Sequence, residues 1–491
     1  MRSPDRRLRG FALARDDTTP LYRQVYEHIR TAIRSGQLRP GDRLPSTRSL
    51  AERFGTARGT MDAAYAILSG EGYVVGRGPA GTMVSADLDS RTIAGAATRQ
   101  RLSTPAPRPA LQAPRPFQMG LPALDAFPRK VWSRLVARHA RGFTPADMAY
   151  PDPAGYAPLR EAIAGYLATS RGVRCSAEQI LITNGYQDAL NLVAGVLLQR
   201  GDKVWLEDPN YPPAAKALKA AGATLVPIRV DAEGLRVSDG LAHARRARLA
   251  VVTPSHQSPL GVALSLSRRL ALLSWAGAAG AWIIEDDYDS EFRYVGRPLP
   301  ALKSLDRDQR VLYAGTFSKV LYPSLRLGYL VVPESVVAAF TRSNRLRHLG
   351  HATLEQRVLA DFMVAGYFAR HLKRMRALYA VRRRALADGL SAVFGDRITV
   401  DLRPGGMHLI ARFASGVSDI KLADLAQAGG LSVEALSRRA TTHSCGQGLL
   451  LGFTNIAEAD ALPTCRRLHQ MIGKSLDNEA RKRLAPSGNR R

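Results

Sequence analysis

The sequence has few cysteines and no long hydrophobic run. Cys175, Cys445 and Cys465 are far apart, so they form neither a disulfide framework nor a zinc-site spacing, and we expect a reducing compartment and no metal site. The arginine-rich N-terminus has no apolar core segment and does not resemble a secretory signal. The longest weakly polar run, Leu272 to Ile284, is too short to span a bilayer. We therefore expect a cytoplasmic protein without a membrane partner.

Acidic residues are also few relative to basic ones. The 491 residues include 70 Lys and Arg against 42 Asp and Glu, which is a formal net charge of +28. Such an excess favours a polyanionic partner, nucleic acid first, although an arginine-rich genome would produce the same balance. The length suits roughly two to four domains of about 100–200 residues each.

Composition changes along the chain and suggests five segments. The polar residues 1–19 are expected to be mobile, and a first compact domain is placed at 15–84. Residues 85–116 include "TPAPRPALQAPRP", which cannot bury a core and is typical of a semi-stiff linker. From 117 to 473, helical patterns alternate with apolar strands such as "KVWLE" and "AWIIED", which predicts an α/β domain with a mainly parallel sheet. Residues 474–491 are expected to be a frayed basic tail.

The first domain has the pattern of a winged helix-turn-helix. Apolar residues recur every four positions from Leu21 to Ile33, which predicts an amphipathic helix over 20–35. Ser46 can cap a short helix that ends at Gly55, and a second helix is expected directly after it. Two such helices around a glycine turn are typical of a helix-turn-helix. The segment "YVVGRGPAGTMV" then predicts a hairpin wing.

The second helix of such a pair reads bases with its N-terminal residues. Arg58 can form a bidentate hydrogen bond with a guanine edge. Arg43, Arg48 and Arg77 are better placed for phosphates or the minor groove. Any single arginine can equally belong to a solvated helix face. The predicted DNA-contacting residues are Arg43, Ser46, Arg48, Arg58, Gly59, Thr60, Arg77 and Gly78.

This segment, from "PLYRQVYEHIRTAIRSGQ" to "GTMV", resembles a GntR-type winged helix-turn-helix over its whole length. The resemblance implies double-stranded operator DNA as a partner, with association to the nucleoid when bound. Some family members have a basic residue where Asp62 stands. The acid here is expected to remove a phosphate contact or to alter base preference.

The stretch "GTFSKVLYPSLRLG" places a lysine at the end of a predicted strand. Ligands gather at the carboxyl ends of strands in a doubly wound sheet, and Lys319 there can form a Schiff base with an aldehyde cofactor. Thr316 and Ser318 offer hydroxyl groups, and Arg326 offers a fork for a phosphate. Most lysines are solvated surface charges, so the hypothesis depends on companion motifs.

Other strand ends supply matching groups for pyridoxal 5'-phosphate (PLP). Asp286 can hold the protonated pyridine nitrogen, and Tyr288 can reach the phenolic oxygen. The Gly185 turn opens a helix whose free N–H groups suit a phosphate, and Tyr211 can stack on the ring. An acidic loop or a glycine turn alone is weak evidence. The predicted cofactor-binding residues are Lys319, Asp286, Tyr288, Arg326, Thr316, Ser318, Tyr211, Gly185, Tyr186 and Gln187.

In order and spacing these motifs resemble the fold type I PLP enzymes of the aspartate aminotransferase superfamily, from about Phe117 onward. The resemblance implies a large domain with a smaller C-terminal α+β subdomain, and Lys319 as the catalytic lysine. It also implies that Arg438 of "LSRR", with Arg439 a close rival, binds a substrate or effector carboxylate.

Three departures from this family's pattern stand out. The segment 257–261, "QSPLG", replaces the usual Asn-Pro-Thr-Gly, so the contact from this segment to the cofactor oxygen is open. Pro151 replaces a common glycine, which puts the reach of Tyr150 to a neighbouring subunit in question. The usual "LSRYY" reads "LSRRA", and the loss of aromatic residues implies an effector pocket of a different shape.

A winged helix joined by a Pro-rich linker to an aminotransferase-like domain resembles the MocR-type regulators of the GntR family over nearly the whole chain. This implies a PLP-dependent transcriptional regulator, a homodimer, and a small amine, amino acid or PLP as effector. A functional aminotransferase with a DNA-binding appendage remains open. A scaffold that never holds PLP is disfavoured by the intact cofactor motifs.

Overall fold

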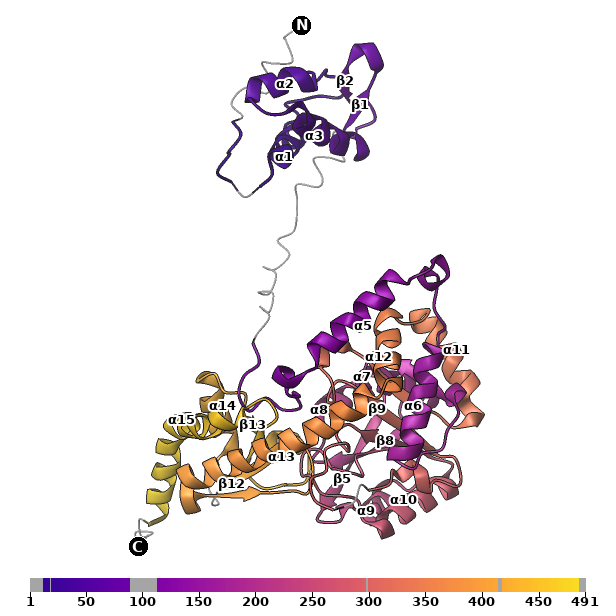
Figure 1. Cartoon of the computed structure of the whole chain (residues 1–491), viewed down its shortest axis with the longest axis vertical. Helices are drawn as coiled ribbons and strands as arrows, with labels where there is room; N and C mark the ends of the chain where they lie inside the picture. Colours follow the sequence, from indigo (N-terminus) through magenta and orange to yellow (C-terminus); the bar gives the residue numbers. More distant parts are fainter. Residues whose placement is uncertain (1–11, 18, 89–112, 297–298, 414–416, 485–491) are drawn as a thin grey trace. The chain divides into compact units, whose positions relative to one another are not determined.

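The computed structural model describes residues 12–17, 19–88, 113–296, 299–413 and 417–484. The chain divides into two compact units, 1–112 and 113–491, and each is considered by itself. Figure 1 shows the helices and strands of both. Among the residues just given, no helix is both long enough and apolar enough to cross a membrane.

The described residues of the first unit form three α-helices and a two-stranded wing, as predicted. Ser46 Oγ accepts a hydrogen bond from the N–H of Ser49 and caps the second helix, which ends at Gly55 in the left-handed conformation. The buried faces of the helices pack around Ile29, Leu50 and Met61. The elements are α1 (Leu21–Arg34), α2 (Thr47–Phe54), α3 (Arg58–Gly70), β1 (Val74–Gly76) and β2 (Thr82–Val84), with the two strands antiparallel.

Part of the segment 1–19, expected to be a mobile arm, contacts the first unit. Leu13 packs against the core of the first unit, and Arg15 Nη2 donates to the carbonyl of Gly55 at 2.9 Å. These contacts join residues 13 and 15 to the first unit. Residues 1–11 lie outside the described part of the chain.

The second unit is built on an eight-stranded sheet, mainly parallel as predicted. The strand order is β3-β10-β9-β8-β7-β4-β5-β6, in which β10 runs antiparallel to both neighbours and β6 is antiparallel to β5. The strands are β3 (Ile180–Thr183), β4 (Lys203–Asp208), β5 (Thr224–Asp231), β6 (Gly234–Leu235), β7 (Leu249–Val252), β8 (Trp282–Asp287), β9 (Val311–Thr316) and β10 (Gly328–Val331).

Helices cover both faces of this sheet. Successive strand residues face opposite sides, so Leu206 packs toward α7 and α8, while Trp205 stacks on Trp275 of α10 with ring centroids 3.7 Å apart. Both faces are buried, which explains the continuous apolar strands in the sequence. The helices are α5 (Arg129–Arg141), α6 (Ala157–Ser170), α7 (Tyr186–Leu197), α8 (Pro212–Ala220), α9 (Val237–Ala244), α10 (Leu266–Ala279), α11 (Val337–His348) and α12 (Leu354–Val364).

A smaller α+β subdomain follows, as expected from the resemblance. The long helix α13 leads from the large sheet to a four-stranded antiparallel sheet of order β11-β12-β14-β13 (Figure 1). Its elements are α13 (Tyr367–Phe394), β11 (Ile398–Asp401), β12 (His408–Phe413), α14 (Asp419–Ala428), β13 (Glu434–Ala435), β14 (Leu449–Gly452) and α15 (Glu458–Leu484).

The ends of the two predicted irregular segments are structured. Most of the linker 85–116 lies outside the described residues, but the N–H of Ser85 donates to Tyr73 and the carbonyl of Pro116 accepts from Ser432. Helix α15 continues to Leu484, so the tail expected to fray from 474 is helical to that point. Residues 485–491 are outside the described chain.

Candidate functional site

The predicted cofactor residues meet at one cavity of about 610 Å³. Because the strands are mainly parallel, their carboxyl ends lie at one edge of the sheet, and the loops after them form the cavity wall. All the predicted cofactor residues except Gly185 line it, and Gly185 directly precedes the lining residue Tyr186 in the chain. The lining includes Tyr186, Gln187, Tyr211, Asp286, Tyr288, Thr316, Ser318, Lys319, Arg326, Arg438 and Arg439.

Lys319 follows β9 and its side chain is partly buried. The Nζ atom donates to the carbonyl of Gly120 at 3.1 Å. Gly120 has φ of +64°, and a Cβ there would clash with the Lys319 amine. Burial lowers the pKa of Lys319, because the charged form loses its hydration. A larger neutral fraction suits an amine that must attack an aldehyde.

Asp286 lies at the end of β8 and has the opposite shift. Burial raises the pKa of Asp286 well above its usual value, and the negative charges of Asp287, Glu207 and Asp289 add to the increase. No cationic side chain of the described residues forms an ion pair with Asp286. A protonated pyridine nitrogen would supply the missing cation, so this carboxyl fits PLP.

Tyr288 presents a neutral hydroxyl group to the same cavity. Burial raises its pKa well above the usual value, and the charge of Asp289 acts in the same direction. Its Oη lies 3.0 Å from Nδ1 of His256, which is also 3.0 Å from Oδ2 of Asp289. Tyr288 is therefore held by a second layer of side chains and can donate to a phenolate oxygen.

The turn before α7 and the loop after β9 form an anion cradle. Gly185 has φ of +86°, and the backbone N–H groups that open α7 have no acceptor within the helix. Arg326 Nη2 donates to the carbonyl of Asn184 at 2.7 Å, and a Cβ on Gly185 would lie 3.6 Å from Nη1. Ser318 and Thr316 add hydroxyl groups nearby. These groups fit the phosphate of PLP.

Tyr211 lies at the start of α8 and is partly exposed in the cavity. Its ring centroid lies 6.4 Å from that of Tyr186, with the planes tilted by 49°. The two rings do not stack on each other, so the face of Tyr211 remains available for a planar ligand.

The adjacent arginines Arg438 and Arg439 have different surroundings. Arg438 Nη2 donates to Asp424 of α14 at 2.7 Å, and 42% of its side chain is exposed. Arg439 forms an ion pair with Glu434 and is only 12% exposed. Burial lowers the pKa of Lys319, and the positive charge of Arg439 adds to this decrease.

Several cavity residues come from segments that the sequence analysis did not single out. Gly120, His408 and Glu434 line the cavity. Ser258 also lines it and belongs to the segment "QSPLG", which departs from the family's pattern. Gln257 does not line it, because its amide donates to Glu207 and to the carbonyl of Pro209. No local motif marks Gly120, His408 or Glu434.

The predicted DNA-contacting residues lie on α2, α3 and the wing. Arg48 and Arg58 are well exposed, but each contacts an acid one turn later: Arg48 Nε lies 3.2 Å from Glu52, and Arg58 Nε lies 3.6 Å from Asp62. Gly59 and Thr60 follow Arg58 in the first turn of α3, and Gly78 is at the wing tip. Arg77 precedes that tip, and the Arg43 guanidinium packs against Gly81.

A cluster outside the predicted sites brings Asp188, His348 and His351 together. Their potential ligand atoms lie within 4.8 Å of one another. His348 Nε2 is 3.1 Å from Asp188 Oδ1, and Arg347 Nη2 is 3.8 Å from the same oxygen. The arginine would repel a cation, so the contacts are those of an ion-pair network at the start of α7.

Comparison with known proteins agrees with both halves of this geometry. Residues 128–436 match the family "Aminotransferase class I and II", and residues 21–84 match "Bacterial regulatory proteins, gntR family". The chain is 41% identical to the "Probable rhizopine catabolism regulatory protein MocR" of Rhizobium meliloti, over 90% of this chain and 92% of that protein. It is 34% identical to the "HTH-type pyridoxine biosynthesis transcriptional regulator PdxR" of Corynebacterium glutamicum, over 90% and 94%.

Among solved structures, the kynurenine aminotransferase of Pyrococcus horikoshii superposes with a TM-score of 0.67 and 27% identity, covering 73% of this chain and 91% of that one. This match agrees with the mixed sheet and with the residues that fit PLP. The chain therefore belongs to the MocR-type regulators, in which a gntR-family DNA-binding domain precedes an aminotransferase class I and II domain that binds pyridoxal 5'-phosphate.

Proposed function

We propose that the chain is a PLP-dependent transcriptional regulator whose second unit senses a small amine, an amino acid or PLP itself. The observation that carries this proposal is a fully equipped cofactor pocket in a chain whose other unit is a winged helix-turn-helix. The relatives named above are regulators, one of rhizopine catabolism and one of pyridoxine biosynthesis, and this supports a regulatory use of the pocket.

Bound PLP supplies an aldehyde that captures primary amines and a ring that withdraws electrons. Lys319 provides the amine that holds the cofactor covalently, and its lowered pKa favours the neutral, reactive form. Asp286 keeps the pyridine nitrogen protonated. Arg326 and the first N–H groups of α7 hold the phosphate, and Tyr288 donates to the phenolic oxygen.

An effector carboxylate is best received by Arg439, with Arg438 as the alternative. Arg439 is the more buried of the two, so a charge-assisted hydrogen bond from it is less screened by water. Both arginines follow β13 in the smaller subdomain, whereas Lys319 follows β9 of the large sheet. An amino acid held by both would connect the two parts of the second unit. It changes DNA binding only if its affinity differs between the two states of the protein.

The test uses DNA selected from a random-sequence library by the full-length protein. DNA affinity is measured by fluorescence anisotropy with PLP alone and with a panel of amino acids and amines. A regulator of this kind shows a DNA affinity that changes with PLP or with one class of amine. An affinity that is independent of PLP and of every amine would contradict sensing.

A functional aminotransferase is the second candidate, since the pocket contains Lys319, Asp286 and Arg439, which would hold the cofactor aldehyde, its pyridine nitrogen and a substrate carboxylate. Steady transamination also requires release of the keto product and acceptance of a second substrate. A multiple-turnover assay with paired amino and keto acids distinguishes the two functions. Catalytic turnover without any effect on DNA binding would favour the enzyme.

A further inference from the structure

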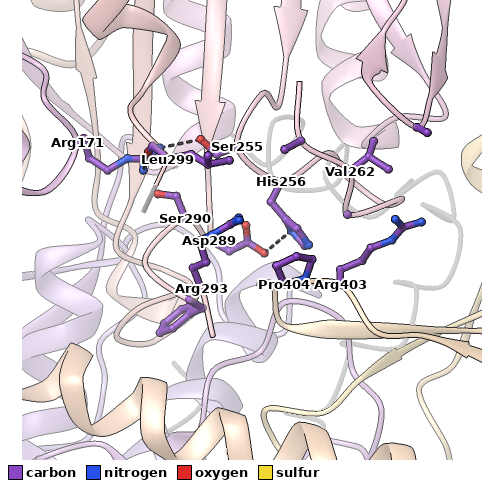
Figure 2. Close-up of a pocket in the computed structure, with 16 residues that line it drawn as sticks. Arg171, Ser255, His256, Val262, Asp289, Ser290, Arg293, Leu299, Arg403 and Pro404 are labelled. Carbon is purple, nitrogen blue, oxygen red and sulfur yellow. Dashed lines mark hydrogen bonds and ion pairs between the residues drawn. The ribbon is translucent and has the colours of Figure 1, made fainter. Parts of the chain in front are cut away.

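A second cavity of about 260 Å³ lies beside the cofactor pocket and shares no lining residue with it. Figure 2 shows its wall, which is formed by the segments after β7 and β8 and by the loop between β11 and β12. An isolated β-bridge between Arg293 and Gly405 joins two of these segments. At roughly 30 Å³ per water molecule, the cavity has room for a small organic ligand.

The cavity contains buried hydrogen-bonding atoms without partners. Within the described part of the chain, four atoms of lining residues are buried and make no hydrogen bond: Ser290 Oγ, Arg293 Nε, Arg403 Nε and Asp289 Oδ2, the last of which lies 3.0 Å from His256 Nδ1. Two of these atoms are guanidinium donors, and the serine hydroxyl can also donate. A buried donor without an acceptor costs about 1–3 kcal/mol, so an acceptor in the cavity would stabilise the protein.

The charges around the cavity favour an anion. Arg171 is already paired with Asp287 and donates to Ser255, and Asp289 is paired with His256. Arg293, in contrast, forms no ion pair with any described residue. Arg403 has only Asp401, at 3.8 Å. The arginines therefore outnumber the carboxylates that could neutralise them here.

The cavity is also connected to the cofactor pocket. Asp289 and His256 line the cavity (Figure 2). His256 Nδ1 also lies 3.0 Å from Tyr288 Oη, which lines the cofactor pocket. A Cβ on Gly406 would clash with the His256 ring, and one on Gly261 would lie 2.9 Å from Nε2. These two glycines let the backbone press against the ring and hold it in place.

We propose that this cavity binds a small carboxylate, with Arg293, Arg403 and Ser290 as donors. A planar carboxylate matches the guanidinium fork, and its charge neutralises Arg293. The ligand lies next to Asp289, so its charge changes the hydrogen bond between His256 and Tyr288. The proposed binding of the carboxylate does not depend on the proposed function of the chain, whereas the effect on the cofactor rests on the proposed role of Tyr288.

The binding test is calorimetric titration of the full-length protein with succinate, acetate and inorganic phosphate. Loss of one charge-assisted hydrogen bond is worth about 1.5–3 kcal/mol, so Arg293→Gln is expected to weaken succinate binding about tenfold or more. Ser290→Ala removes a single oxygen atom and is the second variant in case Arg293→Gln unfolds. The exposed Arg246→Gln is the matched control and is expected to bind as the wild type does.

The effect on the cofactor is read from the visible absorption of the PLP-loaded protein. Succinate is expected to shift the spectrum of the wild type and not that of His256→Gln.

Succinate binding that is unchanged in both Arg293→Gln and Ser290→Ala, or lost only in Arg439→Gln, would place the ligand elsewhere and overturn the proposal. Phosphate binding more tightly than either carboxylate would overturn the ligand class. An unshifted wild-type spectrum would overturn the connection to Tyr288 alone, leaving the function of the cofactor pocket untouched.

Discussion

Burial shifts the pKa values of Lys319 and Asp286, which both line the cofactor pocket, in opposite directions. It lowers the pKa of Lys319 and raises the pKa of Asp286, because removal from water disfavours the charged form of each. A neutral amine and a carboxyl group without a cation are both suited to PLP, which supplies an aldehyde to the first and a pyridinium to the second.

Lys319→Ala is expected to abolish covalent attachment of the cofactor, because no other lysine lines the described cavity. Reduction with borohydride followed by peptide mass spectrometry measures this directly. Lys216→Ala, an exposed lysine on the neighbouring helix α8, is the control and is expected to retain the label on Lys319. A label on another lysine in the wild type would contradict the assignment.

Arg439→Gln is expected to weaken binding of an amino acid effector by about 1.5–3 kcal/mol, and Arg438→Gln by clearly less. The reason is the deeper burial of Arg439 beside Lys319. Amino acid titrations monitored by cofactor absorbance give both affinities. A larger loss in Arg438→Gln would reverse the assignment in favour of the residue that the family resemblance suggested.

Glu207 makes the stability of the second unit depend on pH. Burial raises the pKa of Glu207 from 4.5 to about 7, so between these values the folded state binds more protons than the unfolded state. The free energy of unfolding therefore falls as pH rises through this window, by at most about 1.4 kcal/mol per pH unit for one group. Above this window the contribution is lost and the dependence ends.

Glu207→Gln is expected to reduce this slope, and the slope rather than the absolute stability is the readout. Tryptophan fluorescence during urea unfolding measures it, since all four tryptophans, at 132, 205, 275 and 282, belong to the second unit. The pKa of Glu285 is also raised to about 7 by burial, so a residual slope persists. An unchanged slope in Glu207→Gln would show that Glu207 does not titrate in this range.

At the scale of elements, the recognition helix α3 carries an internal restraint. Arg58 and Asp62 are one turn apart, and the Arg58 Nε atom lies 3.6 Å from Asp62 Oδ2. An exposed pair of this kind stabilises a helix by only about 0.3–0.5 kcal/mol, but it gives Arg58 an intramolecular partner that competes with a base. The pair therefore bears on DNA recognition more than on folding.

Arg58→Ala is expected to weaken binding to selected DNA by about 1–3 kcal/mol and to affect random DNA much less. Asp62→Ala is expected to tighten binding to both, because it frees Arg58 and removes a negative charge near the phosphates. Anisotropy titrations at fixed salt measure both changes. Equal losses on selected and random DNA in Arg58→Ala would make Arg58 a phosphate contact.

At the scale of the whole molecule, the second unit exposes large apolar side chains on segments that touch. Tyr150 and Leu346 are 87% and 82% exposed, and Met148 and Leu349 are also exposed. Pro151 packs against Gly350, which brings the two segments together. A patch of this kind marks an interaction surface, and we propose that it forms a two-fold homodimer with Tyr150 contacting the partner subunit.

Leu346→Asp is expected to raise the dimer dissociation constant about tenfold or more, because a buried leucine is worth about 1.5–3 kcal/mol. Sedimentation velocity over a range of concentrations measures it. Leu270→Asp places the same change on α10, away from these segments, and serves as the control. A monomer at micromolar concentration in the wild type would contradict the dimer.

Most of the fold and the central cofactor residues were predictable from local patterns. Apolar strands followed by polar groups mark Asp286 and Lys319, and parallel strand ends must meet at one edge of a sheet. The winged helix was predictable because Ser46 and Gly55 mark the ends of α2 in the sequence itself. The helical structure of the tail up to Leu484 was not predictable in this way, because no comparable stop signal near residue 474 shows where α15 ends.

The sequence by itself determined the two units, the order of their elements and the chemistry of the pocket, since these depend on local periodicity and on residue type. Tertiary structure alone decided which distant groups complete the pocket. Gly120 accepts a hydrogen bond from Lys319 across 199 residues of chain, and no local pattern encodes that approach. Of the neighbouring arginines, Arg439 is mostly buried and Arg438 contacts Asp424, because the path of the chain after β13 turns one inward and the other outward. Adjacent residues of one type are equivalent in a sequence, and only packing makes them different.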